Sequence, residues 1–123
     1  MDMANAPYGL FCPLAMAAEV LEKRWTILIL GEMWSGAPRF NELRRSVPGI
    51  SASLLTKRLR ELESNGLVER LEDPSKGTID YIRTPKAIEL EPALQILSDW
   101  ACRHVEKDVA LKDVNPDYLI CNI

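Results

Sequence analysis

The clearest periodic segment of the chain lies between Ser51 and Gly66. Leu55, Leu59 and Leu62 recur at i, i+4 and i+7, which places them on one face of a helix. The opposite face collects Ser53, Lys57, Arg60 and Ser64, and Thr56 and Glu61 flank it. Ser51 is a good N-cap, and Gly66 can adopt the left-handed conformation that ends a helix. The pattern therefore predicts one amphipathic helix with a packed leucine face and a polar face.

Three further helical patterns precede this segment. Apolar residues at helical spacing predict a first helix over residues 13–22, with Pro13 in its opening turn. A second helix is expected over residues 25–34, although its Ile-Leu-Ile-Leu centre is also compatible with a buried strand, which periodicity alone does not settle. Phe40, Leu43 and Val47 predict a short third helix. A tight turn at Pro48-Gly-Ile50 then joins it to the Ser51 helix, which is the sequence mark of a helix-turn-helix.

Two strand-like runs and a long helix follow Gly66. Residues 67–72 and 79–83 flank a turn-rich stretch with Lys76 at its tip, so the pair predicts a β-hairpin. Thr84-Pro85 then marks the start of a helix that should reach about residue 107. A helix-turn-helix followed directly by a hairpin is a winged-helix arrangement. The predicted fold class is mainly α with a β-hairpin wing, dimerising through its terminal helices.

Length and composition fit one soluble domain. The 123 residues are 47% hydrophobic and 27% charged, and no basic, apolar leader opens the chain. The most apolar block, residues 25–34, is shorter than the ~20 residues needed to cross a bilayer. We therefore expect a cytoplasmic protein with an N-terminal arm (residues 1–11), a winged-helix domain (residues 12–107) and a tail (residues 108–123).

Charge is unevenly distributed along the chain. The net charge is −3, yet residues 23–70 carry nine basic and five acidic side chains. The rest of the chain carries six basic and thirteen acidic ones. A basic middle between acidic ends fits a positive binding surface on an acidic body.

Few residues support metal or enzyme chemistry. The three cysteines are far apart, no C-x-x-C pair exists, and there is one histidine, so a zinc site is not expected. The chain also lacks a glycine-rich phosphate loop and a Ser/His/Asp or Cys/His constellation. We expect neither an enzyme nor a cofactor.

An ordered set of short blocks runs through the chain. The blocks are Cys12-Pro13, Lys23-Arg-Trp-Thr26, Arg39-Phe-Asn-Glu-Leu-Arg-Arg45, Pro48-Gly-Ile-Ser51, Leu55-Thr-Lys-Arg-Leu-Arg-Glu-Leu62, Gly66-Leu-Val-Glu-Arg70 and Thr84-Pro85. Together they resemble the HxlR-type winged helix-turn-helix transcriptional regulators over residues 12–105. The resemblance implies a dimeric DNA-binding repressor or activator whose Ser51 helix enters the major groove. The two ends of the chain also resemble a longer branch of the family, which makes the tail the possible start of a truncated second domain.

The polar face of the Ser51 helix supplies the first candidates for DNA contact. Lys57 and Arg60 are expected inside the groove, where Arg to guanine is the commonest specific contact. Ser51, Ser53 and Thr56 are expected to bind phosphate or base edges. Arg58 lies beside the leucine stripe and is expected along the protein surface instead.

Flanking cations should position the protein on the DNA backbone. These are Lys23, Arg24, Arg39, Arg44 and Arg45, with Lys76 and Arg83 for the wing. Thr78 stands where related wings often carry an arginine, which leaves the wing contacts to Lys76 and Arg83. Each of these side chains could equally be an ordinary solvated residue.

Cys12 precedes Pro13 at a predicted helix N-terminus, where the helix dipole stabilises a thiolate. Some members of the resembling family sense oxidants or electrophiles through a cysteine at this position. Cys12 is therefore a candidate redox sensor, with a small apolar contact at the dimer interface as the alternative.

The last helix carries an apolar seam at roughly 3.5-residue spacing, which suits packing against a second helix. The candidates for a dimer interface are Leu90, Leu94, Leu97, Trp100, Ala101 and His104.

These features predict a homodimeric transcriptional regulator that binds double-stranded DNA at a pseudo-palindromic operator. It could respond to redox or electrophile signals, and its effector is not identified by the sequence. The alternative is a winged-helix module for protein interaction or dimerisation that does not bind DNA, which the acidic net charge favours.

Overall fold

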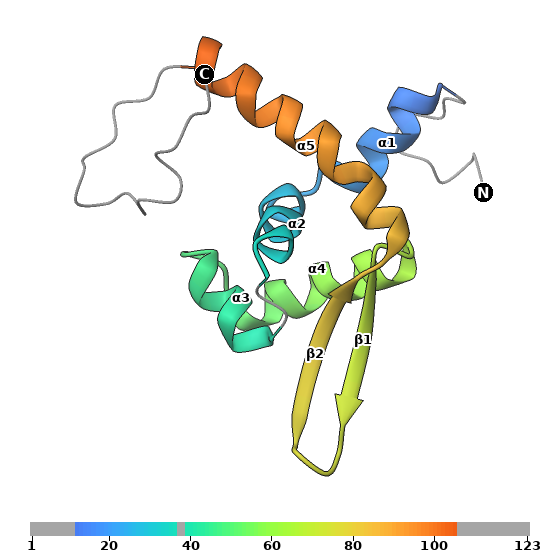
Figure 1. The fold of residues 1–123 in the computed structure, drawn as a ribbon, viewed down its shortest axis with the longest axis vertical. Helices are drawn as coiled ribbons and strands as arrows, with labels where there is room; N and C mark the ends of the chain where they lie inside the picture. Colours follow the sequence, from blue (N-terminus) through green and yellow to red (C-terminus); the bar gives the residue numbers. More distant parts are fainter. Residues whose placement is uncertain (1–11, 37–38, 106–123) are drawn as a thin grey trace. The chain divides into compact units, whose positions relative to one another are not determined.

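The computed structural model describes residues 12–36 and 39–105, and shows the predicted order of elements (Figure 1). The helices and strands are α1 (Pro13–Leu21), α2 (Thr26–Trp34), α3 (Phe40–Ser46), α4 (Ala52–Ser64), β1 (Val68–Asp73), β2 (Thr78–Arg83) and α5 (Pro85–His104). The winged helix-turn-helix prediction is confirmed. The ambiguous apolar block is helix α2 rather than a strand. The predicted arm and tail lie outside the described residues.

Contacts divide the chain into one unit that ends at Glu89 and another that begins at Leu90, within α5. The first unit contains the helix-turn-helix, the hairpin and the first residues of α5. The second contains the rest of α5, including the predicted dimerisation seam. Each is described by itself.

The core of the first unit forms around the leucine face of α4. Leu55, Leu59 and Leu62 are at most 1% exposed. Ile29 on α2 and Leu43 on α3 are fully buried with them. Burial of a leucine or isoleucine side chain stabilises the fold by about 1.5–3 kcal/mol. This burial leaves the other face of α4 in solvent.

The turn between α3 and α4 lies beside the Trp25 ring. A Cβ on Gly49, whose φ is +92°, would lie 3.5 Å from the edge of the Trp25 ring. The sequence predicts that Trp25 begins helix α2, and this is wrong. Trp25 precedes the helix, with a left-handed φ of +81°. That conformation costs a side-chain-bearing residue about 1–2 kcal/mol.

The C-terminal end of α4 is a Schellman motif. Gly66, at φ +74°, donates its N–H to Glu63 O at 3.0 Å, and Leu67 donates to Leu62 O at 2.9 Å. Lys86 Nζ donates to Asn65 O at 2.6 Å, from the first turn of α5. The end of α4 is thereby tied to the start of α5.

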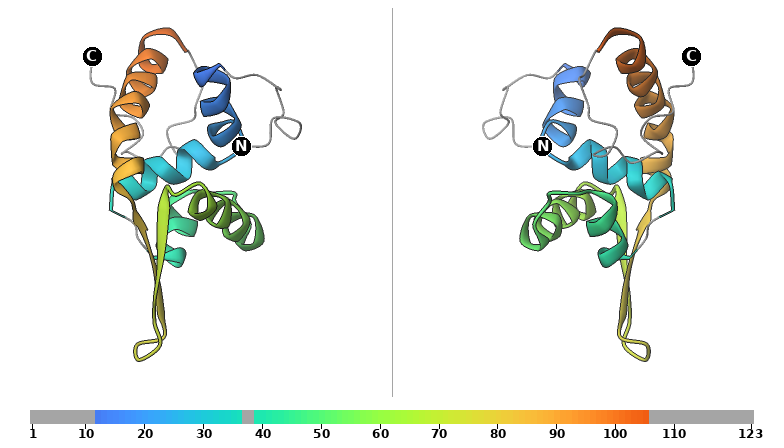
Figure 2. Two further views of the ribbon diagram at one scale, coloured as in Figure 1. Left: turned by 90° about the vertical axis from the view of Figure 1, so that its right-hand side faces the viewer. Right: turned by 90° about the vertical axis from the view of Figure 1, so that its left-hand side faces the viewer.

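The hairpin is antiparallel, with Arg70 opposite Tyr81 and Glu69 opposite Ile82. It extends away from α3 and α4 as a narrow ribbon (Figures 1 and 2). Arg39, just before α3, forms an isolated antiparallel bridge with Asp80. This bridge attaches the hairpin to the helix-turn-helix. No helix among the described residues is long and apolar enough to cross a membrane.

We expect Gly66→Ala to lower the free energy of unfolding by about 1–2 kcal/mol, because alanine resists the left-handed conformation. Gly31→Ala is the matched control, since Gly31 lies inside α2 and a Cβ there meets nothing within 4 Å. That variant should be more stable by up to about 1 kcal/mol. Urea denaturation followed by circular dichroism measures both. Equal loss of stability in the two variants would contradict the left-handed end of α4.

Candidate nucleic-acid interface

The polar face of α4 is in solvent, as predicted. Ser53, Lys57 and Arg60 are exposed, and Thr56 is half-buried. Ser51 is the N-cap, since its Oγ accepts the N–H of Leu54 at 3.2 Å. Thr56 Oγ1 donates to Ala52 O at 2.9 Å, which leaves its oxygen able to accept a further hydrogen bond.

Lys57 and Arg60 carry charge that the described part of the protein does not neutralise. Neither side chain makes an ion pair or a hydrogen bond with any residue in that part. A shallow groove of about 350 Å³ lies along this face, lined by both cations together with Ser53 and Ser64. The groove therefore offers hydroxyls and free cations side by side.

Other predicted cations have partners within the protein. Lys23 Nζ lies 3.6 Å from Glu61 Oε1, and Arg39 Nε lies 3.2 Å from Asp80 Oδ1. The Arg24 guanidinium lies over the Trp25 ring, 5.1 Å from its centroid. Exposed ion pairs are worth about 0–1 kcal/mol, so a phosphate could still displace either carboxylate. Their role in DNA binding stays a prediction.

Arg58 lies along the protein surface, as expected. Its Nε donates to Arg24 O at 2.8 Å, and one guanidinium nitrogen lies 3.1 and 3.2 Å from the Glu61 carboxylate oxygens. Because the bond to Arg24 O joins α4 to the residues before α2, Arg58 positions α4 rather than binding a partner.

The remaining cations lie on α3 and the hairpin. Arg44 and Arg45 are exposed in the last turn of α3. Lys76 is exposed in the loop between β1 and β2, where Asp73 Oδ1 accepts the N–H of Ser75 at 3.1 Å. Arg83 is half-buried opposite Val68, at the base of the hairpin. Lys76 is therefore the better placed of the two wing candidates.

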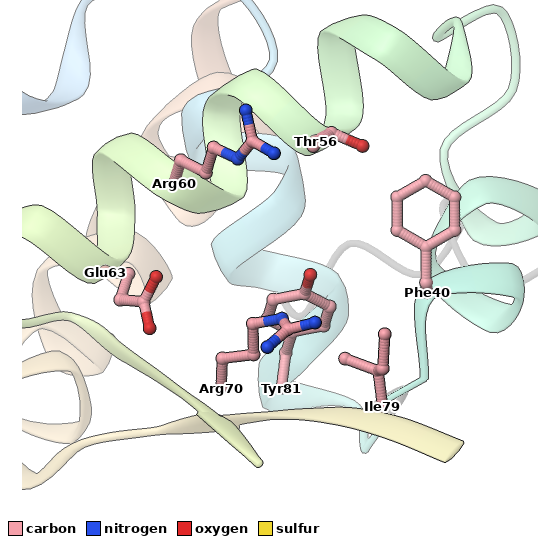
Figure 3. A pocket seen from close by; sticks show the side chains of 7 residues that line it. All are labelled: Phe40, Thr56, Arg60, Glu63, Arg70, Ile79 and Tyr81. Carbon is pink, nitrogen blue, oxygen red and sulfur yellow. The ribbon is translucent and has the colours of Figure 1, made fainter. Parts of the chain in front are cut away.

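A cavity of about 530 Å³ between α4 and the hairpin was not predicted from the sequence. Phe40, Thr56, Arg60, Glu63, Arg70, Ile79 and Tyr81 line it. Figure 3 shows Arg70 and Tyr81 rising side by side from the strands, with the Tyr81 hydroxyl directed toward α4. The Tyr81 hydroxyl and the Glu72 carboxylate raise the pKa of Arg70. The sequence signal that could have indicated this cavity is the alternation of residues 79 and 81 along one predicted strand, with residue 70 on the other.

Cys12 is an exposed free thiol directly before α1. The nearby backbone N–H groups of Ala15 and then Leu14 lower the pKa of this thiol, because their positive ends favour the charged thiolate. Cys102, on α5, is disulfide-bonded. No group of three or more potential metal ligands occurs within the described ranges.

The predicted dimerisation seam on α5 is partly exposed. Leu97 and Trp100 are half exposed, whereas Leu94 is buried. The Trp100 and His104 rings lie 5.8 Å apart between centroids. The remaining seam candidates, Leu90 and Ala101, are half-buried. The role of the α5 seam in dimerisation stays a prediction.

Comparison with known proteins places this arrangement in a family. The sequence pattern of the HxlR-like helix-turn-helix family matches residues 20–109. The chain belongs to the HxlR-like helix-turn-helix family. It is 37% identical over 99 residues to the HTH-type transcriptional regulator YodB of Bacillus subtilis, covering 77% of this chain and 87% of YodB. It is 36% identical over 97 residues to the uncharacterized regulator YvaP of the same organism, covering 77% and 90%.

Solved structures of similar proteins have the same fold. The reduced form of YodB superposes with a TM-score of 0.69 at 35% identity, covering 80% of this chain and all of YodB. The oxidized form of the redox regulator HypR superposes with a TM-score of 0.71 at 32% identity, covering 80% of this chain and all of HypR. YodB and YvaP are HTH-type transcriptional regulators by name, and HypR is a redox regulator.

The environment of Cys12 gives a pH prediction. Its alkylation by iodoacetamide should follow the thiolate fraction, with an apparent pKa below that of an ordinary cysteine thiol. Mass spectrometry after short exposures across a pH series measures the rate. Cys12→Ser is the control, and should lose the fast-labelling site. A titration midpoint at or above that of free cysteine would contradict the role of the Ala15 and Leu14 N–H groups.

Proposed function

We propose that this family member regulates transcription by binding a pseudo-palindromic DNA operator as a homodimer in the cytoplasm. The observation that carries the proposal is the free face of α4. Its hydroxyls and two uncompensated cations face solvent, while its leucines are buried. A helix held in this way can enter the major groove, which admits one α-helix.

The residues on this face divide by their chemistry. Arg60 and Lys57 bind base edges or phosphates, and Ser51, Ser53 and Thr56 bind phosphates near the start of α4. Arg44 and Arg45 extend the basic surface along α3. Lys76 reaches the flanking backbone from the hairpin loop. Lys23, Arg24, Arg39 and Arg83 are further phosphate candidates that hold partners in the free protein.

A homodimer accounts for the apolar seam on α5. Ile96, Leu97 and Trp100 are each at least half exposed, which is costly for a helix that stays unpaired. A two-fold dimer would present two α4 helices to half-sites about 34–36 Å apart, or a multiple of one DNA turn.

Cys12 gives this regulator a redox input. Support comes from its exposure, its lowered pKa and the similarity to HypR, a redox regulator. With hydrogen peroxide, the thiolate sulfur would take one oxygen to become a sulfenate, while the O–O bond breaks and the peroxide is reduced to water.

Removing both groove cations should abolish specific binding. Lys57→Ala with Arg60→Ala is expected to weaken binding to the operator by about 1–3 kcal/mol for each base-reading side chain removed. The slope of log K against log salt should fall by about 0.9 for each phosphate that the variant no longer neutralises. Fluorescence anisotropy on DNA from the upstream region of the gene measures both, with Arg103→Ala as a control for the loss of an exposed cation elsewhere on the chain.

Unchanged DNA binding in the double variant would rule out this face of α4. Wild-type protein that binds no DNA at any salt concentration would favour the alternative, a winged helix used only for protein interaction.

Oxidation should release the operator through Cys12. Wild-type protein treated with hydrogen peroxide is expected to lose its DNA footprint and to recover it after thiol reduction. Cys12→Ser should keep the footprint through the same treatment. A footprint that is lost equally in Cys12→Ser would assign the sensitivity elsewhere in the chain.

A further inference from the structure

The cavity between α4 and the hairpin has the size and lining of a small-molecule site. Its volume of about 530 Å³ lies within the range of ligand pockets, about 300–1,000 Å³. It is formed within the first unit alone, by residues from α3, α4, β1 and β2. The helix-turn-helix and the wing therefore form this cavity without a contribution from the second unit.

One part of the lining is apolar and aromatic. Phe40 from α3, Ile79 from β2 and the Tyr81 ring supply it, with Phe40 and Ile79 at the same end of the cavity in Figure 3. Tyr81 is buried, so its ring is fixed by packing. Aromatic walls favour a flat ring, which packs in offset or edge-to-face arrangements.

The charged part of the lining consists of two cations and one carboxylate. Arg60 and Arg70 are opposed by Glu63 as the one carboxylate among the lining residues. Arg70 already pairs with Glu72, at 3.2 Å between Nη1 and Oε2. Arg60 has no such partner in the described structure. One uncompensated guanidinium suits one carboxylate, because the two groups pair through parallel hydrogen bonds.

We propose that this cavity binds a small aromatic monocarboxylate, and that its occupation releases DNA. The ring lies against Phe40, Ile79 and Tyr81, and the carboxylate pairs with Arg60 and Arg70. Glu63 disfavours a second negative charge on the ligand. The release of DNA rests on the proposed function, whereas the binding site does not.

The ligand would release DNA because the cavity shares residues with the polar face of α4. Thr56 and Arg60 line both the cavity and the shallow groove along α4. A carboxylate paired with Arg60 removes that cation from DNA and adds an anion beside the phosphates. Ligand and DNA therefore compete for the same side chain.

Benzoate is the probe for the site, with uncharged benzamide as its isostere. Titration of the DNA-free protein, followed by NMR chemical shifts, should show saturable benzoate binding. Benzamide should bind at least about tenfold more weakly, since it lacks the charge-assisted hydrogen bonds.

Two variants locate the site. Ile79→Trp fills the cavity without removing a charge, and should weaken benzoate binding by more than about tenfold, because the ring loses its space. Ile82→Trp is the matched control on the opposite face of β2, and should bind benzoate normally. Arg70→Gln should weaken binding about tenfold, which is the effect of removing one charge-assisted hydrogen bond. Ile79→Trp should also keep its operator bound when benzoate displaces the wild-type protein.

The outcomes separate the two proposals. Absent benzoate binding, or binding that Ile79→Trp and Ile82→Trp weaken equally, would overturn the site. Weaker operator binding by Ile79→Trp and Arg70→Gln in the absence of benzoate would mean that the cavity binds the DNA backbone. That result would also overturn the proposed ligand site. Benzoate binding by a protein that binds no DNA would support the site while refuting the proposed function.

Discussion

Burial of the α4 leucines is the constraint on which the rest of the molecule depends. With Leu55, Leu59 and Leu62 at most 1% exposed, the helix has one allowed rotation about its axis. A rotation by one residue, about 100°, would expose the leucines and, in one of the two directions, bury Arg60. Burying an unpaired charge is far more costly than burying a leucine is favourable. The core therefore decides which face of α4 can meet a partner.

The ends of α4 hold that orientation. Ser51 caps the N-terminus, and the Gly66 turn satisfies the carbonyls at the other end. From there Thr84 Oγ1 donates to Gly66 O at 2.6 Å, and Arg58 binds the backbone before α2. These bonds connect the candidate reading helix to α5 and to the residues before α2. A shift of either neighbour would therefore move α4.

Which surface charges are available for binding depends on the local ion pairs rather than on the net charge of the chain. The chain is acidic overall, yet its acids pair with some cations and leave others free. Screening limits exposed charges to about 8 Å at physiological ionic strength, so distant acids do little to the α4 face. Local pairing therefore matters more for binding than the net charge of −3.

The sequence by itself determined the two faces of α4 and most of the elements, but left the block over residues 25–34 open between helix and strand. Leucine spacing, the Ser51 cap and the left-handed Gly66 are local signals, because each depends on residues within a few positions. Tertiary structure decided the rest. Only the folded chain brings Arg39 to Asp80, Lys23 to Glu61 and Arg24 over Trp25, and only it forms the cavity between Arg60 and Tyr81. The pairs Arg39–Asp80 and Lys23–Glu61 join residues far apart in sequence, so their formation depends on how the helices and the hairpin pack, which no local pattern encodes.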